Sequence, residues 1–295
     1  MNRDIFKGLG VALVTPFMEN GAVDFAAVAK VVDNLIAGGV DYILVLGTTG
    51  ETPTLTKDER KALIRFVRER VAGRTALMVG VGGNCTHDVI RTLRTWDLSG
   101  YDAILSVNPY YNKPNQEGLY QHFKAIAEAS PLPVMLYNIP GRTGVNMTPA
   151  TIARIAAECP NVIGVKEASG NLEQMAEIKK LLPNDFLLIS GDDGLTVEVV
   201  KLGGDGVISV LANAYPAETK EFVRLALEGK IDDANEKLKA FDGIISALFE
   251  EGNPTGIKTL LHAKGICTDT MRLPLVSGSD SLLAKCETLI AEYEK

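Results

Sequence analysis

The chain has 295 residues, of which 46% are hydrophobic and 23% charged, and its formal net charge is −7. α/β barrels reach this length as one domain, and the composition is ordinary for a globular enzyme. The acidic balance, without any basic cluster, argues against nucleic acid or an anionic membrane as the main partner.

We expect neither export nor membrane insertion from this sequence. No segment approaches the ~18 consecutive apolar residues of a transmembrane helix. The N-terminal sequence MNRDIFKGLG lacks the apolar core of a signal peptide. The cysteines form no CxxC pair and are expected to be reduced thiols, at Cys85, Cys159, Cys267 and Cys286. We therefore expect a cytoplasmic protein.

Short apolar segments rich in β-branched residues recur along the chain, and each has the length of a buried strand. The expected strands are Leu9–Val14, Tyr42–Gly47, Ala76–Val81, Ala103–Val107, Pro133–Asn138, Val162–Glu167, Phe186–Gly191 and Gly206–Leu211. Between them lie amphipathic segments with apolar residues at helical spacing. Examples that open on an Asp or Thr cap are Asp24–Gly39, Thr56–Gly73 and Thr148–Pro160.

Strict alternation of strand and helix predicts a parallel sheet. Eight such units indicate a closed (β/α)8 TIM barrel, with a doubly wound open sheet as the alternative. No GxGxxG sequence opens the first helix, which disfavours the dinucleotide-binding form of the open sheet. We expect residues 1–215 to form the barrel. Residues 216–295 show only helical periodicity and predict a C-terminal helical extension packed on it.

Lys166 follows the apolar run within the strand segment Asn161–Glu167. The run of Val, Ile and Gly is typical of a strand buried on both faces. Burial of an ammonium group favours the neutral amine, which is a nucleophile that forms Schiff bases with carbonyl substrates. The alternative is a lysine that reaches solvent and pairs with Glu167.

In a barrel of this type the active site lies at the carboxyl ends of the strands. The residues expected there provide one amine, several hydroxyls and small residues, but no carboxylate pair with a histidine. Lysine with tyrosine and threonine suits imine chemistry and proton transfer. The histidines His87, His122 and His262 are far apart in the sequence, so we expect no metal site.

Three further strand-end features are candidates for substrate binding. The GTTGE turn, Gly47–Glu51, offers hydroxyls and backbone N–H groups to a carboxylate, although a plain capped turn has the same sequence. Tyr137 is a candidate proton donor near Lys166, or else a half-buried strand-end tyrosine. Arg142, in the loop PGRTG, can clamp a second carboxylate, or simply be exposed.

Several motifs resemble those of one known family, in the same order and spacing over essentially the whole chain. They are GTTGE, NPYYNKP, LYNIPGRTG, GVKEASGN, GDD, GGDGVISV, NPTGIK and RLPL. The chain is identified by them as a member of the dihydrodipicolinate (4-hydroxy-tetrahydrodipicolinate) synthase family of class I pyruvate aldolases.

The resemblance implies that Lys166 forms a Schiff base with pyruvate, with no cofactor. The resulting enamine would attack aspartate semialdehyde on the route to diaminopimelate and lysine, and Tyr137 would transfer the proton during imine formation. Thr48 and Tyr111 would complete a hydroxyl relay. By the same resemblance, the pyruvate would be held by Gly47 and Thr49 and faced by the carbonyl of Ile208.

In the family, the residue at Tyr111 crosses a dimer interface, so the resemblance implies at least a dimer and commonly a tetramer built as a dimer of dimers. Arg142 would receive the semialdehyde carboxylate. Because sugar-acid lyases usually lack this arginine, it favours the synthase over the alternatives, N-acetylneuraminate lyase and 2-keto-3-deoxy sugar-acid aldolase. A non-catalytic barrel would lack the lysine or the tyrosine.

Many family members are inhibited by lysine in a cleft at the dimer interface. The resemblance places Asn84, Asp88 and Tyr110 in this cleft as ligands for the amino acid. Lys57 and Arg60 also match positions there, and two cations disfavour a cationic ligand. We therefore expect weak inhibition by lysine or none.

Overall fold

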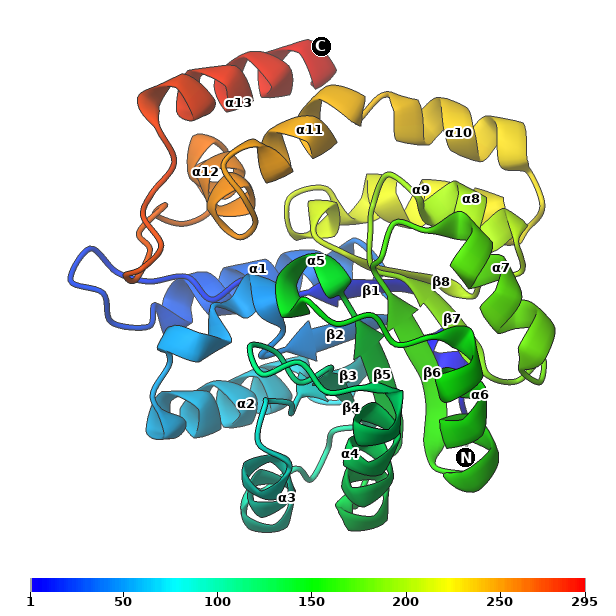
Figure 1. Cartoon of the computed structure of the whole chain (residues 1–295). Coiled ribbons are helices and arrows are strands. Elements are labelled where there is room, and N and C mark those ends of the chain that lie inside the picture. Colours follow the sequence, from blue (N-terminus) through cyan, green and yellow to red (C-terminus); the bar gives the residue numbers. More distant parts are fainter. Residues whose placement is uncertain (1, 295) are drawn as a thin grey trace.

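The computed structural model describes residues 2–294, which form a closed barrel of parallel strands surrounded by helices (Figure 1). The strands pair in chain order, and β8 closes the barrel against β1. They are β1 (Gly8–Ala12), β2 (Tyr42–Val45), β3 (Ala76–Gly80), β4 (Ala103–Val107), β5 (Val134–Asn138), β6 (Val162–Glu167), β7 (Leu187–Ser190) and β8 (Gly206–Ser209). The predicted barrel is confirmed, and the open-sheet alternative is wrong.

Helices follow the strands, and most of them form the outer layer. They are α1 (Phe25–Ala37), α2 (Lys57–Val71), α3 (Thr86–Thr95), α4 (Gln116–Ala129), α5 (Pro140–Thr143), α6 (Pro149–Glu158), α7 (Leu172–Leu181), α8 (Thr196–Lys201) and α9 (Pro216–Leu227). The expected caps start several of them. In α2, for example, the Thr56 hydroxyl accepts from the N–H of Glu59, whose carboxylate accepts from the N–H of Thr56.

The strands have a separate hydrophobic cluster on each face. Inside the barrel lie Phe6, Ala12, Tyr42, Leu44, Met78, Ala103, Leu105, Met135, Tyr137, Ile163, Leu187, Ile189 and Ile208. The larger cluster fills the space between the sheet and the helices, with members such as Val11, Ile43 and Val165. Burial on both faces explains why the strands appear in the sequence as continuous apolar runs.

An irregularity between β5 and β6 sets the direction of the Lys166 side chain. Val134 pairs with Val162 but Met135 pairs with Gly164, so β6 carries one additional residue, Ile163. Ile163 points into the barrel, and strict alternation would then turn Lys166 outward. The irregularity restores the inward direction, because Lys166 pairs in register with the inward-facing Tyr137.

The segment after β8 contributes to two layers. Helix α9 packs on β1 and β8 and completes the ring of outer helices, and α10 (Ile231–Lys239) packs on α8 and α9. Helices α11 (Asp242–Glu250), α12 (Thr255–Ala263) and α13 (Asp280–Tyr293) pack on one another beside the barrel (Figure 1). We call residues 242–293 the C-terminal layer. The predicted C-terminal helical extension runs to Lys295, which lies outside the described residues.

Among residues 2–294, no helix combines the length and apolarity needed to cross a membrane. Short 3₁₀ helices occur at η1 (Asp4–Phe6), η2 (Thr48–Gly50), η3 (Thr52–Thr54) and η4 (Leu211–Asn213).

Arg272, in the loop before α13, ties the C-terminal layer to α2. Its guanidinium donates to Glu59 at 2.6 and 2.9 Å and to the carbonyl of Gly21 at 2.7 Å. The hydrogen bonds from Arg272 lower the pKa of Glu59 to about 2. A lowered carboxylate pKa stabilises the fold above the unfolded-state pKa, and this contribution is lost as the pH falls towards the folded-state value.

We therefore expect Glu59→Gln to lower the free energy of unfolding at neutral pH by about 1–2 kcal/mol, allowing for partial exposure. The difference from the wild type should shrink below about pH 5, where the unfolded carboxylate takes up a proton. Urea unfolding of both proteins at neutral and acidic pH measures this difference. An equal difference at both pH values would contradict the assignment.

Candidate active site

The Lys166 side chain lies inside the barrel mouth against the ring of Tyr137. Its Nζ is 4.5 Å from the ring centroid, and Lys166 as a residue is 5% exposed. Lys166 stands between Tyr137 on β5 and Ile189 on β7 in the strand register. The predicted lysine and tyrosine are therefore neighbours on adjacent strands.

Glu167 is buried on the opposite face of β6 and does not pair with Lys166. Its carboxylate accepts hydrogen bonds from Asn138 Nδ2 at 2.9 Å, from Ser169 N at 2.8 Å and from Gln174 Nε2 at 3.1 Å. Burial raises the pKa of Glu167. Within residues 2–294, no carboxylate lies at ion-pair distance from the Lys166 amine. The alternative of a Lys166–Glu167 pair is wrong.

A cavity of about 450 Å³ opens beside this pair at the mouth of the barrel. Of the predicted site residues, it is lined by Gly47, Thr48, Tyr137 and Arg142. The C-terminal layer forms another part of its wall, through Asn253, Pro254, Pro274 and Leu275. Lys166, Thr49, Ile208 and Tyr111 are not part of the lining, and Tyr111, at 85% exposure, faces solvent.

The Gly47–Glu51 turn is tightly folded and partly buried. Gly50 N donates to Gly47 O and Glu51 N donates to Thr48 O, both at 3.1 Å. The Thr15 hydroxyl donates to Gly50 O at 2.8 Å. Because this turn is the start of η2, its first N–H groups have no acceptor within the helix and are available to an anion.

Asn253 is a site residue that the sequence analysis did not identify. Its Nδ2 donates to the hydroxyl of Thr49 at 3.1 Å, and its carbonyl accepts from Arg142 at 2.8 Å. One residue of the C-terminal layer thus contacts both predicted carboxylate-binding elements. The NPTGIK motif, which contains Asn253, was the available signal, but nothing in its local pattern points to the barrel mouth.

Asp193, in the GDD motif at the end of β7, supports the end of β8. Its buried carboxylate accepts from the Ser209 hydroxyl, from Val210 N at 2.9 Å and from Leu211 N at 3.1 Å. Burial raises the pKa of Asp193. These bonds hold the end of β8, where Ile208 is buried next to the barrel interior.

The residues predicted for a lysine-binding cleft do not share one cavity in the single chain. Tyr110 lines the active-site cavity together with Arg60, whereas Asn84 lines a second cavity of about 550 Å³. Asn84 Nδ2 donates to Tyr110 O at 3.3 Å, and this hydrogen bond connects the walls of the two cavities. Asp88 is on α3 and pairs with Arg91 at 2.8 Å.

The described residues contain no group of His, Cys, Asp and Glu side chains that could hold a metal ion. The cysteines Cys85, Cys159, Cys267 and Cys286 carry free thiols.

Comparison with known proteins places this geometry in one family. The model of the dihydrodipicolinate synthetase family matches residues 5–293. The chain belongs to this family. A 4-hydroxy-tetrahydrodipicolinate synthase of Parabacteroides distasonis is 53% identical over 289 residues, which cover 98% of this chain and 94% of that one. The enzyme of the same name from Phocaeicola vulgatus is 49% identical, covering 98% of this chain and 97% of that one. The crystal structure of dihydrodipicolinate synthase from Aquifex aeolicus superposes with a TM-score of 0.95 at 42% identity and covers 98% of each chain.

Two buried lysines of the structure differ in their partners, and this difference makes a testable prediction. Lys166 has no carboxylate at ion-pair distance among the described residues, whereas Lys258 pairs with Glu51 at 2.5 Å. We expect Lys166→Met to leave stability unchanged or raise it by up to about 2 kcal/mol, because the buried amine has no carboxylate partner to lose. Lys258→Met should cost about 3–5 kcal/mol, because it leaves a buried carboxylate unpaired.

Thermal and urea unfolding of the two variants measure these changes. A loss of stability in Lys166→Met comparable with that in Lys258→Met would contradict this view of the barrel mouth.

Proposed function

We propose that the protein condenses pyruvate with L-aspartate 4-semialdehyde to give 4-hydroxy-tetrahydrodipicolinate, a step of diaminopimelate and lysine biosynthesis. The proposal is supported by membership of the family over the whole barrel, and by relatives of about half-identical sequence that carry this activity in their names. The contact between Lys166 and Tyr137 in the barrel mouth is the observation that carries the chemistry. Nothing in the comparisons favours a sugar-acid aldolase.

The reaction begins when the neutral Lys166 amine attacks the ketone carbon of pyruvate. Loss of water from the carbinolamine gives the Schiff base, and loss of a methyl proton then gives an enamine. The enamine carbon attacks the aldehyde of the semialdehyde. The amino group of the semialdehyde then attacks the imine carbon. This step closes the ring and releases the Lys166 amine. One water is lost overall, and no oxidant, metal or cofactor is needed.

Tyr137 would protonate the departing hydroxyl of the carbinolamine, a role supported by the contact of its ring with the Lys166 side chain. We assign the pyruvate carboxylate to the turn at Gly47, Thr48 and Thr49. Thr48 lines the same cavity as Tyr137, and its hydroxyl would pass protons onward. The carbonyl of Ile208, at the end of β8, would face the bound ketoacid.

Tyr111 has no role within a single chain, because its side chain is exposed and lies outside the cavity lining. Its positive φ of 74° fixes an outward-pointing loop conformation that few non-glycine residues adopt. We propose that Tyr111 completes the hydroxyl relay in a second subunit. The functional form would then be at least a dimer, assembled further into a tetramer of two dimers. We place the reaction in the cytoplasm.

Reductive trapping tests the proposal directly. Treatment with pyruvate and borohydride should inactivate the protein, and the mass of the peptide carrying Lys166 should increase by one reduced pyruvate. Borohydride without pyruvate is the control, and Lys166→Ala should show no adduct. Without a pyruvate-dependent adduct the proposal fails. An adduct without consumption of aspartate semialdehyde would indicate a different pyruvate aldolase.

Tyr137→Phe should keep the fold and pyruvate binding but lower kcat by roughly 10²-fold or more, because a general acid–base is lost. The control is Tyr101→Phe, which removes a buried hydroxyl that donates to Ile64 O far from the site. Steady-state kinetics measure both variants. A Tyr137→Phe enzyme with wild-type kcat would remove this residue from the proton path.

Arg142→Ala should raise the KM for aspartate semialdehyde by at least about tenfold while the KM for pyruvate changes little, because one bidentate carboxylate partner is lost. Arg154→Ala is the control, since Arg154 pairs with Glu117 on the outside of the barrel. Unchanged semialdehyde kinetics in Arg142→Ala would contradict the assignment.

A further inference from the structure

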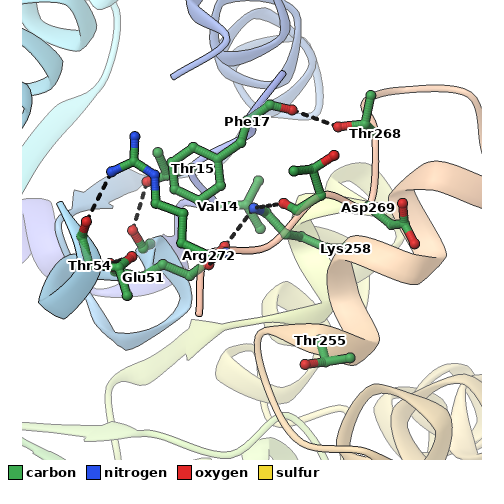
Figure 2. A network of polar contacts seen from close by, with 12 residues as sticks. Val14, Thr15, Phe17, Glu51, Thr54, Thr255, Lys258, Thr268, Asp269 and Arg272 are labelled. Atoms are coloured by element: carbon green, nitrogen blue, oxygen red, sulfur yellow. Dashed lines mark hydrogen bonds and ion pairs between the residues drawn. The ribbon is translucent and has the colours of Figure 1, made fainter. Parts of the chain in front are cut away.

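The Gly47–Glu51 turn is joined to the C-terminal layer by an ion pair that is closed off from solvent (Figure 2). Glu51 ends this turn, and Lys258 lies on α12. The side chains of both residues are 0% exposed, and Lys258 Nζ lies 2.5 Å from Glu51 Oε1. The ammonium also donates to Thr270 O at 2.9 Å and lies 4.1 Å from the ring centroid of Phe17. Every contact of the Lys258 head is thus with protein.

Such a pair is a poor means of stabilising a fold. The desolvation of two charges roughly cancels their attraction, and apolar residues of similar volume often serve as well or better. Burial lowers the pKa of Lys258, and the neighbouring Glu51 opposes that shift. A buried pair of this kind is therefore more informative about the geometry that it enforces than about stability.

The backbone of Glu51 is the part whose geometry is enforced. Its φ is 52°, a left-handed conformation that costs energy in a non-glycine residue. Its N–H donates to Thr48 O at 3.1 Å, and its carbonyl accepts from the backbone N–H of Thr54 at 3.0 Å. Glu51 thus connects η2 to η3. Because its N–H is bonded to Thr48 O, a displacement of Glu51 would also displace Thr48.

The C-terminal layer also contacts a second residue of the turn, Thr49. Asn253, a few residues before Lys258, donates to the Thr49 hydroxyl, and Arg272 N approaches Glu51 Oε2 at 3.4 Å. The turn is therefore held at two of its residues, Thr49 and Glu51, by a segment far along the chain, since Asn253 and Thr49 are 204 positions apart.

We propose that the buried Glu51–Lys258 ion pair is a positioning device, which holds the Gly47–Glu51 turn in the geometry that receives the pyruvate carboxylate. The inference rests on the proposed function, because it assigns the pyruvate carboxylate to this turn. Both side chains are fully buried, although Glu51 belongs to the lining of the cavity. They act by fixing the positions of Thr48 and Thr49. Helix α12 therefore contributes to the geometry of the active site.

The decisive variant is Glu51→Gln/Lys258→Met, which removes both charges and leaves no lone buried ion, so that it should fold with a melting temperature close to that of the wild type. We expect its KM for pyruvate to rise by about tenfold or more, since a turn displaced by ~1 Å misplaces the carboxylate. The KM for the semialdehyde should stay within about threefold, because Arg142 keeps its contact with Asn253 O.

The matched control is Asp41→Asn/Lys220→Met. It removes an ion pair at the other end of β2, where Asp41 precedes the strand and its carboxylate accepts from Leu9 N. This variant should keep the wild-type KM for pyruvate. If Glu51 and Lys258 served only to stabilise the fold, their double variant would have a lower melting temperature and a smaller fraction of active enzyme, but an unchanged KM for pyruvate. This result would overturn the proposal.

Hydrogen exchange on the wild-type protein gives a second test that needs no variant. Pyruvate should slow exchange both in the turn at residues 47–55 and in the C-terminal segment 254–272, because the pair couples them. Slowing in the turn alone would overturn the proposal. A wild-type protein that forms no pyruvate adduct on Lys166 would instead refute the proposed function, so the two failures are distinguishable.

Discussion

The site depends on one placement, a lysine amine kept inside a closed barrel with an aromatic ring beside it and no carboxylate at ion-pair distance within the described residues. An amine without a carboxylate partner is free to approach a carbonyl carbon in the cavity. The parallel strands supply this environment because they are buried on both faces, and their carboxyl ends meet at one mouth. The irregularity between β5 and β6 then decides that Lys166 points into that mouth.

The C-terminal layer gives the mouth its shape. Asn253 contacts both the Thr49 hydroxyl and Arg142, and Lys258 pairs with Glu51 on the same turn. These contacts join residues that are far apart in the chain, so the turn after β2 is defined as much by α12 as by its own sequence. A barrel that ended after α9 would keep Lys166 and Tyr137 but would lose one wall of the cavity.

The sequence was sufficient for the features that depend on local pattern. Apolar β-branched runs predicted each strand, and their alternation with helices predicted the closed barrel, because burial on both faces leaves a periodic signal. Lys166 and Tyr137 stood out because a polar group at the end of a buried strand breaks that pattern. The roles of Asn253 and Lys258 had no such signal, since they arise from packing between distant segments. The additional residue in β6 was also hidden, because Ile163 fits either face of the strand.

The most direct measurement is a high-resolution crystal structure of the protein with pyruvate bound. It should show continuous density from Lys166 Nζ to the ketone carbon, with the pyruvate carboxylate against the N–H groups of the Gly47–Glu51 turn. Pyruvate seated elsewhere, or attached to a different lysine while Lys166 stays unmodified, would contradict the account of this site.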